Sequence, residues 1–284
     1  MLRWYARRGR PLAFRATSDP WAILVSEVMA QQTQAARAAE AWSRFMASYP
    51  SPAALASAPL ADVLRAWRGL GYNRRAVLLQ RAAIAIVRGH RGAVPSDLDA
   101  LDRLPGVGPY TARAVAALAF GRRVGAVDTN VRRVLTRAFF DDPAGPPADP
   151  ASLQALADVL APPTAPGTWT HALMDVGATV CRIRSPRCAA CPLAFACAWA
   201  AGRRASVAAG VARRERPFTT TSRWLRGRIL DRLRDLDDGA WLAFGEAIGT
   251  HDIAAVAAAL ESLRRDALVE LRGTAPAEAR LPHA

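Results

Sequence analysis

The chain has 284 residues, and 51% of them are hydrophobic, which is enough for a buried core and excludes a largely disordered protein. Aromatic residues make up only 7%, so closely packed helices are favoured over β-sandwiches. The formal net charge is +14, and all 38 basic residues are arginines. A globular protein this basic usually binds a polyanion. Nucleic acid is the first candidate, and a compositional bias of the genome is the alternative explanation.

Neither a membrane segment nor a secretion signal is predicted. The sequence has no run of about 18 apolar residues, and residues 1–8 are basic without an apolar stretch or a cleavage site behind them. We therefore expect a cytoplasmic, nucleoid-associated protein that acts as a monomer and does not bind membranes. Thiols stay reduced in that compartment, so the four cysteines are expected to bind metal rather than to form disulfides.

The helical elements follow in chain order from their caps and their apolar spacing. Asp19-Pro20 predicts a helix start, because Asp caps helix N-termini and Pro is favoured at the first helical position. The apolar residues that follow, at 21, 24, 25, 28 and 29, mark one buried stripe. Further helices are predicted after Ser51 and Ala58, over 77–89, over 110–120, after Asp128, and twice between the loop 141–147 and Cys181.

The C-terminal part differs from the rest in composition and pattern. Residues 202–217 are rich in Ala and Arg and predict a linker. Residues 218–284 predict two helices and a short strand, over 222–235, 253–265 and 268–271. We therefore expect an all-α fold over residues 1–201, followed by a small α+β unit whose element order is winged-helix-like.

Four cysteines lie within 17 residues in the pattern C-x6-C-x2-C-x5-C: Cys181, Cys188, Cys191 and Cys197. Thiolates packed this closely suit a compact iron–sulfur cluster. A structural zinc ion is the alternative, but zinc ribbons usually contain two C-x2-C pairs and this segment contains one. The loop also carries three arginines that are candidate phosphate contacts, Arg182, Arg184 and Arg187.

A tight turn between two predicted helices is the second motif, Leu104-Pro105-Gly106-Val107-Gly108. Its glycines allow backbone N–H groups to approach an anion closely, and the next helix directs the positive end of its dipole there. Such a turn grips a phosphate without reading base sequence. Gly-x-Gly turns are also common as purely structural features, so this motif is specific only in combination with the others.

Two carboxyl groups form the third candidate. Glu27 lies between Val25 and Val28 on an apolar helix, where burial penalises the charged form and keeps the acid protonated near neutral pH. Asp128 follows Gly108 by twenty residues, and an N-cap is its simplest structural role. A protonated Glu27 would be ready to donate a proton.

The segment Ser26-Glu27-Val28-Met29-Ala30-Gln31-Gln32-Thr33 closely resembles the S-E-V-M-x-Q-Q-T signature of MutY-type adenine DNA glycosylases, which belong to the helix-hairpin-helix superfamily. Residues 67–72, Trp-Arg-Gly-Leu-Gly-Tyr, resemble that family's W-x-G-L-G-Y. The cysteine spacing resembles the [4Fe–4S] loop of the same family. The likeness covers most of residues 1–200.

The resemblance implies a role for each motif. Its catalytic set is Glu27 as the acid, Asp128 as the group that stabilises or attacks the oxocarbenium sugar, and Tyr110 and Asn130 as the residues that hold them. Its DNA-binding set is Arg15, Gln32, the wedge Tyr72, the turn residues Pro105, Gly106, Val107 and Gly108, and the loop arginines Arg182, Arg184 and Arg187. Its metal ligands are the four cysteines, around a [4Fe–4S] cluster.

The chain also departs from the family's pattern. Phe14, Asn73 and His171 stand where the family usually has Trp, Tyr and Gln, which weakens the prediction of adenine specificity. Residues 218–284 show no motif of the Nudix-like domain that reads 8-oxoguanine in many members. Tyr110 takes the place of the lysine that bifunctional relatives use for strand cleavage, and the chain contains no lysine.

We expect a monofunctional enzyme that flips adenine out of double-stranded DNA, where it is mispaired with guanine or 8-oxoguanine, and hydrolyses its N-glycosidic bond. The first alternative is a glycosylase on the same scaffold that acts on mismatched or damaged pyrimidines. The second is a non-catalytic DNA-binding protein. Glu27 argues against the first alternative, and the presence of both Glu27 and Asp128 argues against the second.

Overall fold

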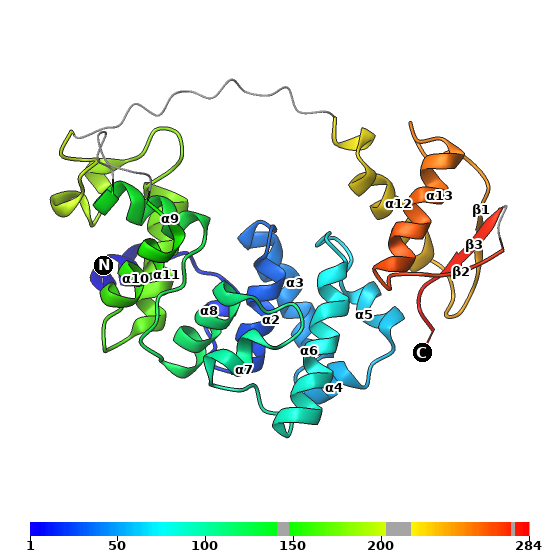
Figure 1. The fold of residues 1–284 in the computed structure, drawn as a ribbon, viewed down its shortest axis with the longest axis horizontal. Helices are drawn as coiled ribbons and strands as arrows, with labels where there is room; N and C mark the ends of the chain where they lie inside the picture. The colour runs from blue at the N-terminus through cyan, green and yellow to red at the C-terminus, as the bar shows by residue number, and fades with distance from the viewer. Residues whose placement is uncertain (141–147, 203–216, 274–275, 284) are drawn as a thin grey trace. The chain divides into compact units, whose positions relative to one another are not determined.

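The computed structural model describes residues 1–140, 148–202, 217–273 and 276–283. The predicted loop 141–147 and nearly all of the predicted linker 202–217 lie outside the described residues. None of the helices in the described ranges combines the length and the apolar character that crossing a bilayer requires. The backbone is mostly helical, with a small sheet near the C-terminus (Figure 1).

The chain divides into two compact units that are each built from separated segments. The first comprises residues 1–27, 94–103 and 107–210. The second comprises residues 28–93, 104–106 and 211–284. The chain passes between the units within helix α2 (Pro20–Ala30), whose start at Asp19-Pro20 is as predicted: the Asp19 carboxylate accepts hydrogen bonds from the backbone N–H groups of Trp21 and Ala22.

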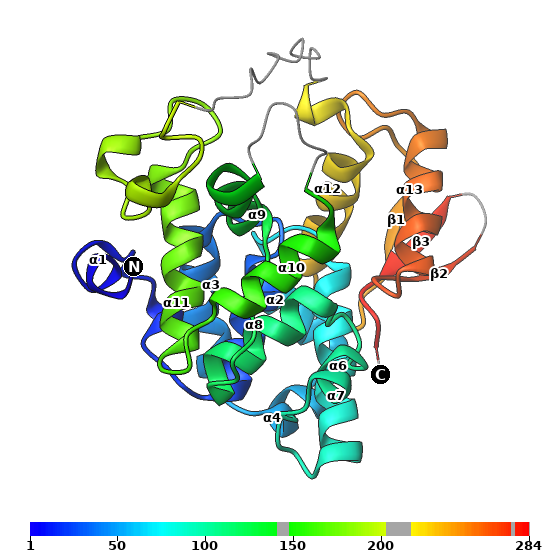
Figure 2. The same cartoon turned by 60° about the vertical axis from the view of Figure 1, so that its left-hand side comes forward.

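The first unit is helical, and proline or a capping aspartate marks most of its helix starts. Asp97, Asp128 and Asp149 each accept a backbone hydrogen bond in the first turn of their helix. Figure 2 shows α8, α9, α10 and α11 from the side on which they are clearest. The helices are α1 (Leu2–Arg8), α7 (Leu98–Asp102), α8 (Pro109–Phe120), α9 (Thr129–Leu135), α10 (Pro150–Leu160) and α11 (Pro166–Asp175), with a 3-10 turn η1 at Ala13–Arg15 and a π-helical segment η3 at Val176–Val180.

A core of aliphatic side chains from α9, α10 and α11 holds this unit together. Its fully buried members include Val131, Leu135, Leu153 and Val176. Alanines such as Ala114 and Ala157 are buried among them, so helices approach closely, as the alanine-rich composition predicts. Removing one of these large side chains is expected to cost about 2–5 kcal/mol of folding free energy.

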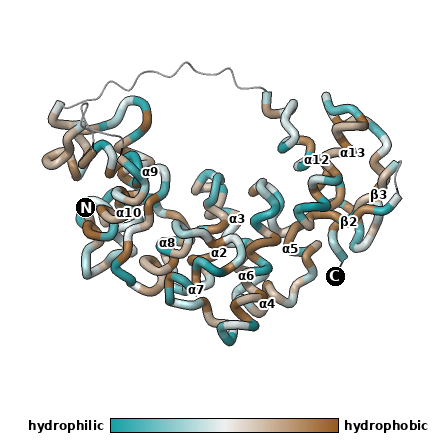
Figure 3. Tube along the Cα trace, in the orientation of Figure 1, coloured by the Kyte–Doolittle hydropathy of each residue, from teal (hydrophilic) through white to brown (hydrophobic). Residues whose placement is uncertain are grey.

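The second unit starts with four helices, α3 (Ala35–Ser48), α4 (Pro52–Ala56), α5 (Leu60–Ala66) and α6 (Arg74–His90). Trp67 is its largest fully buried side chain, and its indole N–H donates to the Gly71 carbonyl. Phe45 packs edge-on against Trp67. Hydrophobic and hydrophilic residues alternate along these helices (Figure 3), which is typical of helices that bury one face.

The C-terminal part of the second unit is a small α+β structure. Helices α12 (Ser222–Arg234) and α13 (Ile253–Arg265) pack together through leucines and isoleucine, and both were predicted within a residue of their ends. Strands β1 (Leu242–Phe244), β2 (Glu270–Arg272) and β3 (Ala277–Arg280) form, within the described residues, an antiparallel sheet in the order β1-β3-β2. The predicted strand 268–271 overlaps β2. The other two were missed because they are only three and four residues long. The predicted fold class, mostly helical with a small C-terminal α+β part, is confirmed.

Candidate active site

Glu27 lies on α2 in an unbroken run of buried residues from Trp21 to Met29, and only 7% of it is exposed. Tyr110, in the first turn of α8, donates a hydrogen bond from its hydroxyl to Glu27 Oε2 at 3.0 Å. The two residues are 83 positions apart in the chain. The structure therefore brings together two predicted catalytic side chains and places them in the same unit.

Burial raises the pKa of Glu27 to about 7, and the negative charge of Asp128 acts in the same direction. The hydrogen bond from Tyr110 and the charge of Arg15 act against this rise. The pKa of Tyr110 is raised well above its ordinary value, mainly by burial, so the phenol stays a neutral donor. Glu27 thus has the property expected of a general acid at neutral pH, a pKa close to the pH at which it works.

Asp128 is the N-cap of α9, and both of its oxygens are engaged. Oδ1 accepts from the Val131 N–H at 2.6 Å, and Oδ2 accepts from Asn130 Nδ2 at 3.1 Å. The structural role considered for Asp128 is therefore real, and it does not exclude a catalytic one. Capping fixes the carboxylate at the positive end of a helix, and its charge is felt by Glu27 and Tyr110.

Arg133 connects this carboxylate to the cysteine loop. Its guanidinium donates to Asn130 Oδ1 at 2.8 Å, to the Gly177 carbonyl at 2.6 Å and to the Cys181 carbonyl at 2.7 Å. Gly177 leaves no room for a side chain, because a Cβ there would lie 2.6 Å from the Asn130 Cβ. Arg133 was not predicted as a site residue, and its place one turn after Asn130 was the only signal for it.

Arg15 and Asp175 form a buried ion pair in the first unit. The two side chains make two hydrogen bonds, at 2.7 and 2.9 Å, and Asp175 also accepts two from Arg10. Burial disfavours the charge of Asp175, but these arginines outweigh it and lower the pKa of the carboxyl group. Asp175 was not predicted as a site residue, although an Asp at the end of an apolar helix is an unusual residue to bury.

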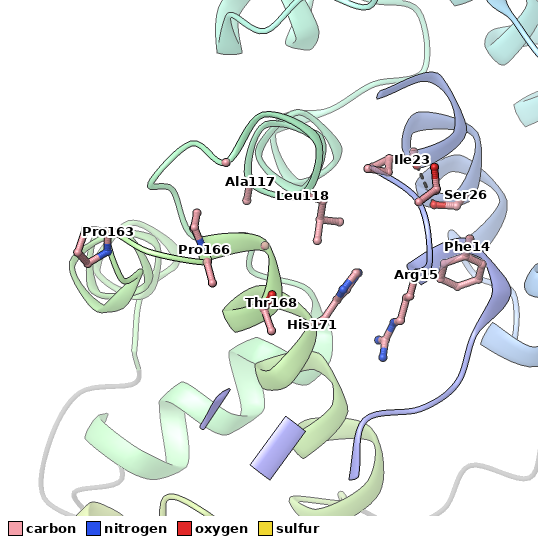
Figure 4. A pocket seen from close by; sticks show the side chains of 14 residues that line it. Phe14, Arg15, Ile23, Ser26, Ala117, Leu118, Pro163, Pro166, Thr168 and His171 are labelled. Atoms are coloured by element: carbon pink, nitrogen blue, oxygen red, sulfur yellow. Dashed lines mark hydrogen bonds between the residues drawn. The ribbon is translucent and has the colours of Figure 1, made fainter. Parts of the chain in front are cut away.

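Arg15 and His171 line a cavity of about 430 Å³ in the first unit. Figure 4 shows their side chains projecting into the same space, with Phe14 and Ser26 on one side and α8 on another. Burial lowers the pKa of His171 to about 3, helped by the charge of Arg15, so the imidazole is neutral. Arg15 was predicted to bind DNA. Its side chain is 7% exposed and paired with Asp175, so any such contact is to a group that enters the cavity.

The predicted phosphate-binding turn lies between α7 and α8. Gly106 has a φ of +77°, and a Cβ there would come within 2.7 Å of Leu78 Cβ, so only glycine fits. Gly108 is the N-cap of α8 and offers no side chain to it, which leaves the first N–H groups of the helix available. Val107 is 6% exposed, so this residue presents its backbone rather than its side chain.

Gln32 and Tyr72 both belong to the second unit, and both have left-handed backbone conformations, with φ of +53° and +45°. The buried Arg75 joins their two loops. Its guanidinium lies 5.7 Å from the centre of the Tyr72 ring. It donates to carbonyls at the end of α2 and in the loop that follows, those of Val28, Met29 and Gln31, and to the carbonyls of Leu70 and Gly71 beside Tyr72. Arg75 was not predicted, since nothing in a single sequence distinguishes it from its neighbour Arg74.

The four cysteines surround a small apolar cavity with Arg137 and Trp199. Burial raises the pKa of Cys191, and the charges of the other three cysteines act in the same direction. Arg137 lies over the Trp199 ring at 4.5 Å and donates to Cys181 Sγ at 3.5 Å. No three His, Cys, Asp or Glu side chains of the described residues converge on one metal ion. The loop residues Arg182, Arg184 and Arg187 are exposed, as a phosphate contact requires.

Residues 25–162 match the family described as "HhH-GPD superfamily base excision DNA repair protein". The chain is 48% identical to an adenine DNA glycosylase of Mycobacterium tuberculosis, over 95% of this chain and 88% of that protein. It is 39% identical to the adenine DNA glycosylase of Homo sapiens, over 69% of this chain and 38% of that protein. Its fold is similar to that of a thermostable thymine-DNA glycosylase, with a TM-score of 0.66, 29% identity, and coverage of 71% of this chain and 93% of that one.

Proposed function

The chain belongs to the adenine DNA glycosylases of the HhH-GPD superfamily, enzymes of base excision repair, and we propose that it removes adenine mispaired with guanine or 8-oxoguanine from double-stranded DNA and leaves the strand intact. The observation that carries this proposal is the pair formed by Glu27 and Asp128. One carboxyl group is buried with a pKa near 7, and the other is held at a helix N-terminus next to it.

In the proposed reaction, Glu27 gives its proton to a ring nitrogen of the flipped adenine, so the base leaves as a neutral molecule. The N-glycosidic bond breaks, and its electron pair departs with the base. Asp128 stabilises the positive charge that develops on the sugar, or forms a bond to its anomeric carbon that water later displaces. A water molecule then adds its oxygen to that carbon and loses a proton to Glu27.

Tyr110 and Asn130 position these two groups. The Tyr110 hydroxyl orients Glu27 Oε2 and cannot take up its proton, because the phenol is already protonated. Asn130 occupies one oxygen of Asp128, and Arg133 in turn fixes the Asn130 amide. Glu27 Oε2 and Asp128 Oδ2 are therefore each held by a neighbouring side chain, which keeps the geometry ready before the base arrives.

DNA contacts are proposed for the features that remain exposed. The turn 105–108 offers backbone N–H groups to a phosphate, and Arg182, Arg184 and Arg187 offer guanidinium groups. Tyr72 is 41% exposed, and Gln32 lies on the neighbouring loop, so both are accessible to a distorted base pair. Arg15 and His171 are proposed to face the extruded base, because they line a cavity rather than an open surface.

A [4Fe–4S] cluster is proposed as the group held by Cys181, Cys188, Cys191 and Cys197. Four sulfurs around a small apolar space fit it. A structural zinc ion is the alternative, but zinc ribbons usually contain two C-x2-C pairs and this segment contains one. Bound by these four residues, such a cluster would cross-link the loop. Through Arg133 and Asn130, the loop it organises supports Asp128.

A single-turnover assay tests the substrate. Duplexes that pair adenine with guanine, 8-oxoguanine, cytosine or thymine are compared with T·G and U·G duplexes. Cleavage of adenine opposite guanine and 8-oxoguanine, without release of thymine or uracil, is expected. The fold's similarity to a thymine-DNA glycosylase makes pyrimidine release the second candidate. Thymine or uracil excision faster than adenine excision would establish that candidate instead.

A further inference from the structure

The C-terminal part of the second unit is not built to bind phosphates. Residues 218–284 contain nine arginines and ten acidic residues, a net charge of −1 in a chain whose total is +14. Among the described residues, six of these arginines are paired with a carboxylate of the same segment: Arg226, Arg228, Arg234, Arg264, Arg272 and Arg280. A role other than electrostatic DNA binding is therefore needed to explain this segment.

Helix α12 instead lies against the loop 67–73, which belongs to the same unit and carries Tyr72. In its last turn, Arg234 is 7% exposed and donates to the Leu64 carbonyl at 2.9 Å and to Asn73 Oδ1 at 2.7 Å. Just beyond the helix, Asp235 forms an ion pair with Arg68. A buried guanidinium that satisfies a carbonyl and an amide is a specific contact, because either group left unpaired would cost folding free energy.

The first turn of α12 contacts Tyr72 itself. Arg223 donates to the Tyr72 hydroxyl, and its guanidinium lies 5.4 Å from the centre of the Tyr72 ring. The same guanidinium lies 4.9 Å from the centre of the Phe218 ring. Three residues of this loop have a left-handed backbone conformation, and two of them, Gly69 and Gly71, are glycines. Tyr72 is the third, and a non-glycine residue in this conformation must be held by neighbouring contacts.

We propose that α12 is a brace for the loop 67–73, and that Arg223 and Arg234 are positioning residues for Tyr72. Arg223 fixes the orientation of the ring, and Arg234 fixes the backbone that follows it through Asn73. The inference rests on the proposed DNA contact of Tyr72. It explains why Asn replaces an aromatic residue at position 73: the amide oxygen accepts the Arg234 hydrogen bond.

The orientation of Tyr72 is measured without DNA, in protein labelled with 3-fluorotyrosine. The chain has four tyrosines, and the Tyr72 resonance is assigned with Tyr72→Phe. Arg223→Met, which keeps the apolar stem but removes the donors and the charge, is expected to shift and broaden this resonance. Arg264→Met is the matched control, because Arg264 is an exposed arginine of α13 paired with Glu261. An unchanged Tyr72 resonance in Arg223→Met would overturn the proposal.

The consequence for function is measured on the full-length protein with a duplex containing an abasic-site analogue. Arg223→Met and Arg234→Met are expected to weaken binding about fivefold, the effect of losing one charged contact, while the single-turnover rate at saturating DNA stays unchanged. Arg264→Met, which removes the same charge, should bind like the wild type. Unchanged binding in both variants would overturn the positioning role.

A separate variant tests whether Tyr72 contacts DNA at all. If Tyr72→Ala binds the abasic duplex as the wild type does, the proposed DNA contact of Tyr72 is wrong. The brace is then judged by the fluorine resonance alone. Because Arg234→Met removes a buried guanidinium, its melting temperature is compared with that of Arg234→Gln, which keeps a donor to Asn73. Rescue of binding by Gln supports the hydrogen bond as the cause.

Discussion

Glu27 and Asp128 are the two carboxyl groups on which the proposed chemistry depends. Glu27 is neutral for much of the time at neutral pH because it is buried, and Asp128 is kept accessible to hydrogen-bond donors at the start of α9. A difference of environment rather than of residue type separates acid from anion, which is how enzymes run acid and electrostatic catalysis with the same functional group.

Replacing either carboxyl group tests these roles. Glu27→Gln removes the proton donor and Asp128→Asn removes the charge, so each variant is expected to lose about a hundredfold or more in single-turnover rate while binding to a mismatch stays nearly intact. Glu40→Gln, at an exposed acid of α3, is the control and should act like the wild type. Adenine cleavage at the wild-type rate by either site variant would show that its assigned role is wrong.

The pH dependence follows from the raised pKa of Glu27. The acid must be protonated, so the single-turnover rate is expected to be nearly constant well below pH 7 and to fall about tenfold per unit well above it. The hydrogen bond from Tyr110 lowers this pKa, so its removal in Tyr110→Phe should move the falling limb to higher pH. A limb that stays in place, or that moves to lower pH, contradicts the assignment of Glu27 as the acid.

At the scale of elements, the N-terminus of α9 and the π-helical segment η3 depend on each other. Arg133 of α9 donates a hydrogen bond to the Gly177 carbonyl of η3. Because Gly177 has no side chain, η3 can pack closely against Asn130 of α9. The Asp128 carboxylate is thus positioned by helix packing as much as by its role as the N-cap.

Gly177→Ala tests this packing. Its Cβ would collide with Asn130, so we expect a loss of about 1–3 kcal/mol of stability and a reduced single-turnover rate, because Asn130 holds Asp128. Gly89→Ala is the matched control: it lies in α6 with no atom within 4 Å of its added Cβ, and it should be neutral or slightly stabilising. Thermal melts and single-turnover assays measure both. A fully active Gly177→Ala would show that the approach is not required.

The cysteine loop is the second element that makes a measurable prediction. Anaerobically purified protein is expected to be yellow-brown, with iron in stoichiometric amount and a broad absorption at about 400 nm. Cys191→Ser should lose iron and weaken DNA binding, because the arginines of the loop lose their support. Zinc in stoichiometric amount with no iron would contradict the cluster and support the zinc alternative.

Across the whole molecule, positive charge is distributed unevenly. The C-terminal segment 218–284 has a net charge of −1, so the excess of arginine belongs to the remainder of the chain. Arginine also replaces lysine throughout, and a guanidinium stays protonated where an amine would not. The chain therefore carries many permanent positive charges but has no side-chain amine for covalent chemistry.

This absence predicts that the strand is left uncut. Strand-cleaving relatives need an amine that forms a Schiff base with the sugar, and the phenol of Tyr110 cannot form one. Denaturing gels should show cleavage at the excised adenine only after alkali, and borohydride should trap no protein–DNA adduct, while a lysine-dependent lyase serves as the positive control. Trapping that disappears when the N-terminal amine is blocked would refute the prediction and identify that amine as the nucleophile.

Local sequence by itself determined most of the helices, several of their caps, the turn 104–108 and the cysteine set, because each depends on spacing within a few residues. It did not indicate α1, α3 or α7. Only the tertiary structure decided the partners of Arg15, Arg75, Arg133 and Arg223, and the strand order of the small sheet. In a chain with 38 arginines, composition cannot indicate which ones are buried. The roles of the buried arginines depend on groups that lie far away in the sequence and that folding brings together. Arg15 and Asp175, for example, are 160 positions apart in the chain.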